Sequence, residues 1–162
     1  RIVETEAYKA PEDKACHAHL NRFTKRTSVM FAKGGRSYVY LCYGIHHLFN
    51  IVTGPKGAAH AILIRAIEPL WGLDHQAERR AGLSKKQWTS GPGKLTKALG
   101  ISRDDNNEAL NTKNAKIYIC DTPKRPGKVL AAPRIGIGYA EECTSWPWRF
   151  LDPDSEFISA PP

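Results

Sequence analysis

The first eight residues, RIVETEAY, place two carboxylic acids and a phenol at alternate positions: Glu4, Glu6 and Tyr8. The segment has the composition of a β-strand, and alternate residues of a strand point to the same face of a sheet. We therefore expect the acids and the ring to face one space. A carboxylate that stays charged there can take a proton from water and act as a general base.

Arg65 is the expected partner of these acids. It interrupts residues 61–67 (AILIRAI), an otherwise apolar segment, and a buried guanidinium is costly unless it is paired. The alternative is an arginine at a strand edge whose charged end reaches solvent. A buried carboxylate–guanidinium pair would favour catalysis, whereas an exposed arginine would not.

Three tyrosines follow, and they fall into two groups. Tyr38 and Tyr40 share one face of an expected strand, where packing in the core explains most aromatic residues. Tyr43 stands beside Gly44 at an expected hairpin tip, residues 43–49, where polar residues are usual. An exposed aromatic side chain at such a tip can enter DNA between base steps.

The elements that must position these residues indicate an α+β fold in a single domain. We expect a curved, largely antiparallel sheet with flanking helices and a protruding β-hairpin that enters DNA, because strands and helices alternate without the regular rhythm of a parallel sheet. The expected strands are residues 1–8, 37–43, 50–53, 61–67, 117–120, 129–132 and 135–139. The expected helices are residues 11–20, 68–81 and 94–99.

Composition narrows the possible partners. The chain has 162 residues with a formal net charge of +8, and a basic surface favours polyanions, although many basic proteins bind no nucleic acid. It contains no apolar run of eighteen residues, so we expect no membrane span. The four cysteines are widely separated, which favours reduced thiols in an intracellular protein.

We expect no metal and no cofactor. The histidines match no zinc-binding spacing. The turn SGPGKL, residues 90–95, lacks the spacing of a phosphate-binding loop.

The chain resembles the alkyladenine (3-methyladenine) DNA glycosylase family, also called the methylpurine DNA glycosylases. The resemblance lies in RIVETEAY, PEDKACHAH, RFTKR, YVYLCYG, NIVTG, LIRAIEP, SGPGKLTKALGI and PRIGIGYA, which occur in order and at matching spacing over nearly the whole chain. It implies a monofunctional DNA glycosylase that starts base excision repair of alkylated or deaminated purines. The base would be flipped out of the duplex and the N-glycosidic bond hydrolysed by an activated water. The expected partner is damaged double-stranded DNA, with no membrane and with the protein acting as an intracellular monomer.

The resemblance also implies roles for individual residues. Glu6 would be the general base, with Arg65 and the backbone carbonyl of Ile135 positioning the water. Tyr43 would fill the space that the nucleotide leaves. The base pocket would be formed by Tyr8, His17, Tyr40, Asn50 and Ile135, with His17 acting mainly through its backbone amide and Asn50 discouraging guanine. Phosphate contacts are expected from Arg22, Lys25, Arg26 and Lys94.

The chain departs from the family pattern at several places, and two of these departures bear on the fold and on the substrates. It begins almost on the first motif, whereas relatives carry a helix and a strand before it, so we expect a single domain, residues 1–162, without those elements. His46 and His47 replace bulkier hydrophobic residues near the hairpin tip. This second change leaves the range of substrates open.

Two other functions remain possible on the sequence alone. A non-catalytic nucleic-acid-binding module would use the same charge and tyrosines, but it would not need a buried Glu6–Arg65 pair. A glycoside hydrolase acting on sugars would use Glu4 and Glu6 together, although a charge of +8 gives no reason for a neutral substrate.

Overall fold

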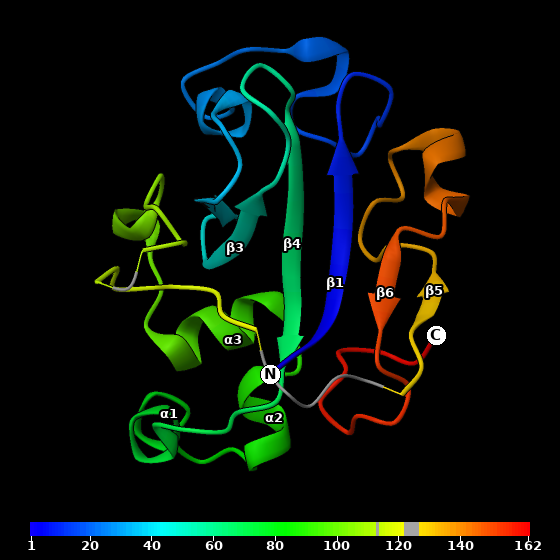
Figure 1. Ribbon diagram of the computed structural model, residues 1–162. Helices are drawn as coiled ribbons and strands as arrows, with labels where there is room; N and C mark the ends of the chain where they lie inside the picture. The colour runs from blue at the N-terminus through cyan, green and yellow to red at the C-terminus, as the bar shows by residue number, and fades with distance from the viewer. Residues whose placement is uncertain (113, 122–126) are drawn as a thin grey trace.

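A single antiparallel sheet organises the computed structural model, which describes residues 1–112, 114–121 and 127–162 (Figure 1). Within this part of the chain, six strands are ordered β2-β3-β4-β1-β6-β5, and every neighbouring pair is antiparallel. The α+β class with a curved, antiparallel sheet is confirmed. The strands are β1 (Ile2–Lys9), β2 (Arg36–Cys42), β3 (His46–Val52), β4 (His60–Ile67), β5 (Leu130–Ala132) and β6 (Arg149–Leu151).

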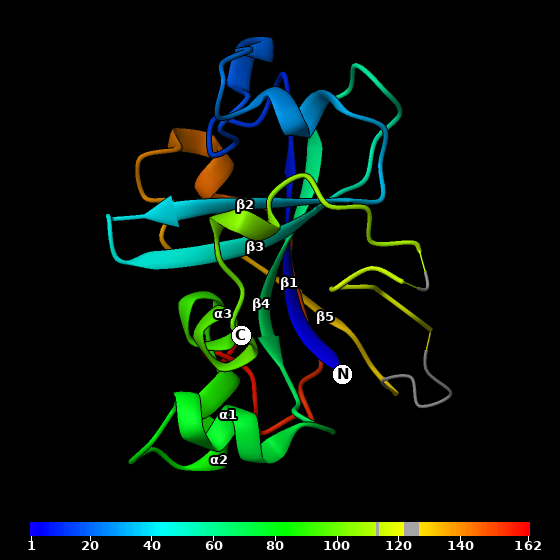
Figure 2. The same ribbon diagram turned by 90° about the vertical axis from the view of Figure 1, so that its left-hand side faces the viewer.

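Three short α-helices gather at one end of the sheet, as Figures 1 and 2 show. Leu95 of the third helix is fully buried and packs with Val39, Phe49 and Ile64 from the strands, which fixes this helix against β3 and β4. None of the helices in the described ranges is long and apolar enough to cross a membrane. The helices are α1 (Leu73–Arg79), α2 (Lys85–Thr89) and α3 (Pro92–Leu99), and the 3-10 turns are η1 (His19–Asn21), η2 (Ser28–Phe31), η3 (Arg103–Asp105) and η4 (Glu141–Ser145).

The pairing of β1 with β4 is irregular where the expected acids and arginine meet. Glu4 lies opposite Ala66, but the next residue, Thr5, lies opposite Ile64, so Arg65 is an extra residue in the ladder. Such irregularities in a ladder change the direction of a side chain and are frequent next to active sites. Arg65 is thereby placed beside both acids of β1.

β2 and β3 form the protruding hairpin that the sequence predicts. In Figure 2 the pair extends sideways beyond the rest of the molecule. Its loop is only Tyr43–Ile45, since the return strand begins at His46 and not at residue 50 as expected. Tyr43 and Gly44 both have positive φ, 50° and 74°. The side chain of Tyr43 is 88% exposed, so it takes no part in the core.

Two expected strands are wrong, and one strand was not predicted. Residues 135–139 look like a strand because apolar residues alternate with glycine, but Gly136 has φ of 77° and the amide of Ala140 donates to Ile137, which makes a turn. Within the described part of the chain, residues 117–120 make one backbone hydrogen bond, from Ile119 to Leu110, and form no ladder. The unpredicted strand is β6, whose three residues are too few to give a period.

The predicted helix over residues 11–20 is also wrong. The segment consists of turns that end in η1, because the Asp13 carboxylate accepts from the amide of Ala15 and from Arg134. Of the expected helix 68–81, only Leu73–Arg79 is helical. The helix expected at 94–99 is confirmed and begins at Pro92, while α2 was not predicted.

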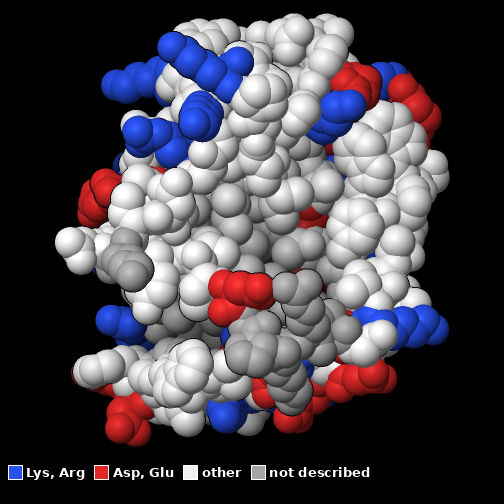
Figure 3. Space-filling view, viewed as in Figure 1, with Lys and Arg blue, Asp and Glu red and all other residues white. Residues whose placement is uncertain are grey.

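Figure 3 shows one face of the molecule in the orientation of Figure 1. Lysine and arginine side chains gather at the upper margin of this face, over the segments that connect the strands. Its centre is largely uncharged. On this face, therefore, the positive charge lies mainly at the margin.

The pair formed by Asp13 and Arg134 fastens the loop after β1 to the loop after β5. Both Arg134 Nη atoms donate to Asp13, over 2.6 and 2.7 Å, and both side chains are fully buried. Arg134 also donates to the carbonyl of Ala7. We predict that Arg134→Lys lowers the free energy of unfolding by about 3 kcal/mol, because one ammonium cannot replace a two-pronged buried pair. Urea denaturation measures the loss.

Lys14→Ala is the matched control for this prediction. Lys14 lies in the same loop as Asp13 and pairs with two acids of η4, Glu141 and Glu142, but those pairs are exposed to solvent. Exposed ion pairs contribute little to stability, so Lys14→Ala should have nearly the same free energy of unfolding as the wild-type protein. Equal behaviour of the two variants would contradict a structural role for the buried pair.

Candidate functional site

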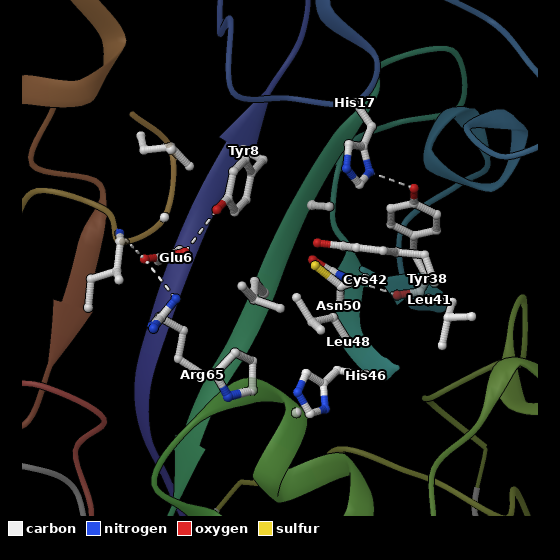
Figure 4. Close-up of a pocket in the computed structure, with 18 of the residues that line it drawn as sticks. Glu6, Tyr8, His17, Tyr38, Leu41, Cys42, His46, Leu48, Asn50 and Arg65 are labelled. Atoms are coloured by element: carbon white, nitrogen blue, oxygen red, sulfur yellow. Dashed lines mark hydrogen bonds and ion pairs between the residues drawn. The ribbon is translucent and has the colours of Figure 1, made fainter. Parts of the chain in front are cut away.

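A cavity of about 790 Å³ lies against the sheet between β1 and the hairpin. Figure 4 views it from the side opposite to Figure 1, since the order of the strands across the picture is reversed. Ten of the residues predicted from the sequence line this cavity: Glu6, Tyr8, His17, Arg26, Tyr40, Tyr43, Asn50, Arg65, Lys94 and Ile135. Arg22 instead lines an adjoining cavity of about 650 Å³, together with Arg26, and Lys25 is exposed and lines neither.

Glu6 is the acid that faces the cavity, and its side chain is fully buried from solvent. The Tyr8 hydroxyl donates to Oε2 over 2.8 Å, and the amide of Ile135 donates to Oε1 over 2.7 Å. Arg65 Nη1 lies 3.2 Å from Oε1 (Figure 4). Burial of a carboxylate is costly without partners, and these three groups offset that cost. Ile135 contacts Glu6 through its backbone N–H group, whereas the sequence expectation concerned its carbonyl group.

Arg65 is 7% exposed, so the alternative of a solvent-reaching arginine is wrong. Its guanidinium pairs with Glu6 through Nη1 and with Glu4 through Nε, each over 3.2 Å. The predicted pairing of Arg65 with the acids of β1 is confirmed.

Glu4 is equally buried but is not among the residues that line the cavity. Besides Arg65, it accepts from Arg149 Nη1 over 3.1 Å and from the backbone amide and hydroxyl of Ser159 over 2.5 and 2.8 Å. From the described residues, Oε1 of Glu4 thus accepts three hydrogen bonds and Oε2 accepts one. Because Glu4 does not line the cavity, it is not placed to act there as a second catalytic acid, which removes the basis for the glycoside hydrolase alternative.

His17 is held as a neutral ring on the far wall of the cavity. Its Nδ1 lies 2.8 Å from the Tyr38 hydroxyl, and its Nε2 lies 3.2 Å from Arg26 Nη2. A guanidinium can only donate, so Nε2 accepts and Nδ1 carries the hydrogen, which it donates to Tyr38. Burial, and then the charge of Arg26, lower the pKa of His17 to about 4.

Aromatic rings with guanidinium groups over them form the walls. Arg134 lies 4.7 Å from the ring centre of Tyr8, and Arg26 lies 4.8 Å from that of Tyr40. The rings of His17 and Tyr40 meet edge to face at 4.6 Å. Burial and the neighbouring charge of Glu6 raise the pKa of Tyr8, so Tyr8 remains a neutral hydrogen-bond donor to that carboxylate.

Asn50 completes the pocket from β3. It is buried, and its side-chain amide donates to the backbone carbonyl of Tyr38 over 3.0 Å, which fixes the orientation of the side chain. The cavity therefore combines aromatic walls, one oriented amide and one carboxylate. Such a combination suits a flat, polar heterocycle.

Sequence reasoning missed four residues that support the site: Tyr38 as the partner of His17, Arg134, Arg149 and Ser159. A signal exists for Arg134, a charged residue at the start of the otherwise apolar PRIGIGY. A serine carries no comparable signal. Among the described residues, no group of three or more His, Cys, Asp or Glu side chains is arranged to hold a metal ion.

Comparison with known proteins gives consistent results. The family model for methylpurine-DNA glycosylase (MPG) matches residues 1–156. The relatives include three proteins with the name "Putative 3-methyladenine DNA glycosylase". The protein of Chlamydia pneumoniae is 51% identical over 93% of this chain and 76% of its own length. That of Chlamydia felis is 46% identical over 93% and 77%, and that of Bacillus cereus is 42% identical over 98% and 82%.

The lowered pKa of His17 makes stability depend on pH. Between pH 6.5, the ordinary value of the side chain, and about 4, the unfolded chain binds a proton that the folded protein does not. The contribution is therefore present above pH 6.5 and is lost as the pH falls towards 4. We predict that His17→Gln, which cannot titrate, reduces the difference in unfolding free energy between pH of about 7 and about 4.5 by roughly 1–3 kcal/mol.

Urea denaturation at the two pH values checks this expectation, and His75→Gln is the control because His75 is exposed. An unchanged pH dependence in the His17 variant would show that this ring is not the titrating group.

Proposed function

The chain belongs to the methylpurine-DNA glycosylase family, and from this premise we propose that it flips damaged purines out of duplex DNA and releases them with a water activated by Glu6. As a member of this family, it is a DNA glycosylase, a hydrolase of N-glycosyl bonds that acts on DNA. The proposed substrates are 3-methyladenine, 7-methylguanine, hypoxanthine and ethenoadenine. Release of the base would leave an abasic site and start base excision repair.

The observation that carries this proposal is a single buried carboxylate at the wall of an aromatic-lined cavity of about 790 Å³, which is large enough to admit a base. Cleavage of an N-glycosidic bond builds positive charge on the sugar, and a fixed carboxylate stabilises that charge and accepts a proton from the attacking water. Among the described residues, Oε2 of Glu6 accepts one hydrogen bond, from Tyr8. A lone pair therefore remains for a water in the cavity, which Arg65 and the carbonyl of Ile135 would help to orient.

We propose that Tyr8, Tyr40 and His17 hold the extruded base. The side chain of Asn50 would meet the 2-amino group of guanine and so disfavour binding of that base. Both ring nitrogens of His17 already have hydrogen-bond partners, which supports a contact with the base through the backbone amide of this residue. Arg22, Lys25, Arg26 and Lys94 would contact phosphates. The target atom lies inside the duplex, so the base must leave the stack at a cost of a few kcal/mol.

The non-catalytic alternative is less well supported. A module that only binds nucleic acid needs stacking surfaces and positive charge. It has no use for a buried carboxylate whose charge is balanced by Arg65 within the cavity.

The test is base release from duplexes that contain hypoxanthine or ethenoadenine, without added metal. We predict that the wild-type protein liberates free base and leaves alkali-labile sites. Glu6→Gln should still bind the duplex but release base about 10²–10⁴-fold more slowly, the usual contribution of a positioned general base. Single-turnover kinetics and binding titrations separate the two effects.

Glu12→Gln is the control, since Glu12 lies close by in the loop after β1 but is exposed and pairs with Lys9. A full rate in the Glu6 variant would mean that another group activates the water. A wild-type protein that binds every lesion duplex and releases no base would favour the binding module.

A second prediction concerns Tyr43. Because its side chain is 88% exposed, Tyr43→Ser should leave stability nearly unchanged. Without a ring to fill the vacated stack, the nucleotide returns sooner, and stacking on an aromatic ring is worth about 1–3 kcal/mol. Excision from paired duplex should fall roughly ten- to a hundred-fold, and excision of an unpaired lesion should fall less.

A fluorescent base analogue beside the lesion reports flipping directly. Tyr118→Ser is the matched control, because Tyr118 is also exposed but does not line the cavity. If the Tyr43→Ser variant loses no more activity on paired lesions than on unpaired lesions, the side chain that fills the stack lies elsewhere.

A further inference from the structure

We propose that Ser159, in the segment after β6, is a positioning residue for base release: it holds Arg65 in the orientation in which this side chain reaches Glu6. The inference rests on the proposed function, because it concerns how the same site is kept ready. Ser159 lies outside the cavity and touches neither the water nor the base in that proposal.

The Ser159 hydroxyl stands between an acid and a guanidinium. Its oxygen lies 2.8 Å from Glu4 Oε1 and 3.2 and 3.3 Å from Nη2 and Nε of Arg65. A carboxylate accepts and a guanidinium donates, so the hydroxyl donates to Glu4 and accepts from Arg65. A hydroxyl can fill both roles at once. An apolar side chain can fill neither.

This arrangement divides the guanidinium between two tasks. The edge formed by Nε and Nη2 is held by Ser159, and Nε also reaches Glu4, while Nη1 is left to pair with Glu6 at 3.2 Å. Arg65 thus stands between two carboxylates that both attract it. Arginine binds a carboxylate best through two parallel hydrogen bonds.

Loss of the hydroxyl would change this balance. Nη2 would lose its acceptor and Glu4 would lose a donor, and a rotation of the guanidinium towards Glu4 would satisfy both. Such a rotation withdraws Nη1 from Glu6. Because Glu6 keeps its bonds to Tyr8 and Ile135, the acid would stay in place while the group that orients the water moves.

Ser159 is itself held firmly. Its backbone amide donates to Glu4 Oε2 over 2.5 Å. Arg149 donates to the carbonyls of Ala160 and Pro161, over 3.1 and 2.9 Å, and to that of Pro133 over 3.0 Å. The segment is therefore tied both to β1 and to the loop that supplies the amide of Ile135.

The experiment measures base release and duplex binding separately for Ser159→Ala and Ser159→Thr in the full chain. With a hypoxanthine duplex, Ser159→Ala should lower the single-turnover rate constant by about ten- to a hundred-fold, the effect of a small displacement of a positioning group, and leave the dissociation constant within roughly two-fold. Ser159→Thr keeps the hydroxyl and should restore most of the rate. A purely structural serine would not produce this split or this rescue.

Ser155→Ala is the matched control. Its hydroxyl lies in the same segment and accepts from the amide of Phe157 over 3.3 Å, away from Arg65. It should affect stability without affecting the rate constant. If Ser159→Ala does not fold, Ser159→Cys replaces it, since the thiol keeps the size but is a poor hydrogen-bonding group.

Wild-type rates in the folded alanine or cysteine variant, or no rescue by threonine, would overturn the role of Ser159. A wild-type protein that releases no base would instead overturn the proposed function. The two failures are thus distinguishable.

Discussion

The burial of two carboxylates on one face of β1 is the constraint on which the rest of this structure depends. Glu4 and Glu6 are both fully shielded from solvent, and such charges are tolerated only where partners surround them. Tyr8 of β1 donates one hydrogen bond to Glu6, but the positively charged partners come from neighbouring strands. Arg65 comes from β4 on one side, and Arg149 comes from β6 on the other. The acids can be balanced from both sides only because β1 lies between β4 and β6. The position of β1 in the sheet and the charge balance of the site therefore depend on each other.

The two acids show how neighbours, and not residue type, decide chemistry. They stand two residues apart on one strand and each has three partner residues in the described part of the chain, but two arginines hold Glu4 outside the cavity, whereas Glu6 pairs with one arginine and faces the cavity. Two of the partners of Glu4, Arg149 and Ser159, come from the far end of the chain. They convert one of two similar acids into a support and leave the other available for a reaction.

Sequence reasoning succeeded where a local pattern has one physical solution. The alternation in RIVETEAY predicted β1 and the shared face of its acids, and the single charge in AILIRAI predicted the buried pairing of Arg65. It failed where distant groups decide. Residues 11–20 satisfy the rules for a helix but fold around Arg134, which lies more than a hundred residues away. The strand β6 and the contact of Ser159 with Arg65 have no local signal, because both depend on segments that only the fold brings together.

The hairpin tip differs from the buried site in that side-chain packing within the described part of the chain does not offset its cost. Tyr43 adopts a left-handed backbone conformation, φ of 50°, which costs roughly 1–2 kcal/mol in a residue other than glycine. Its ring is 88% exposed, so packing returns no stabilisation. The regular pairing of β2 with β3 and the turn bond from Ile45 to Cys42 hold this conformation in place. Strain that persists without an internal benefit is characteristic of functional sites, and a ring presented in this way at the rim of the cavity is suited to a partner that supplies the missing contacts, as an opened base stack does.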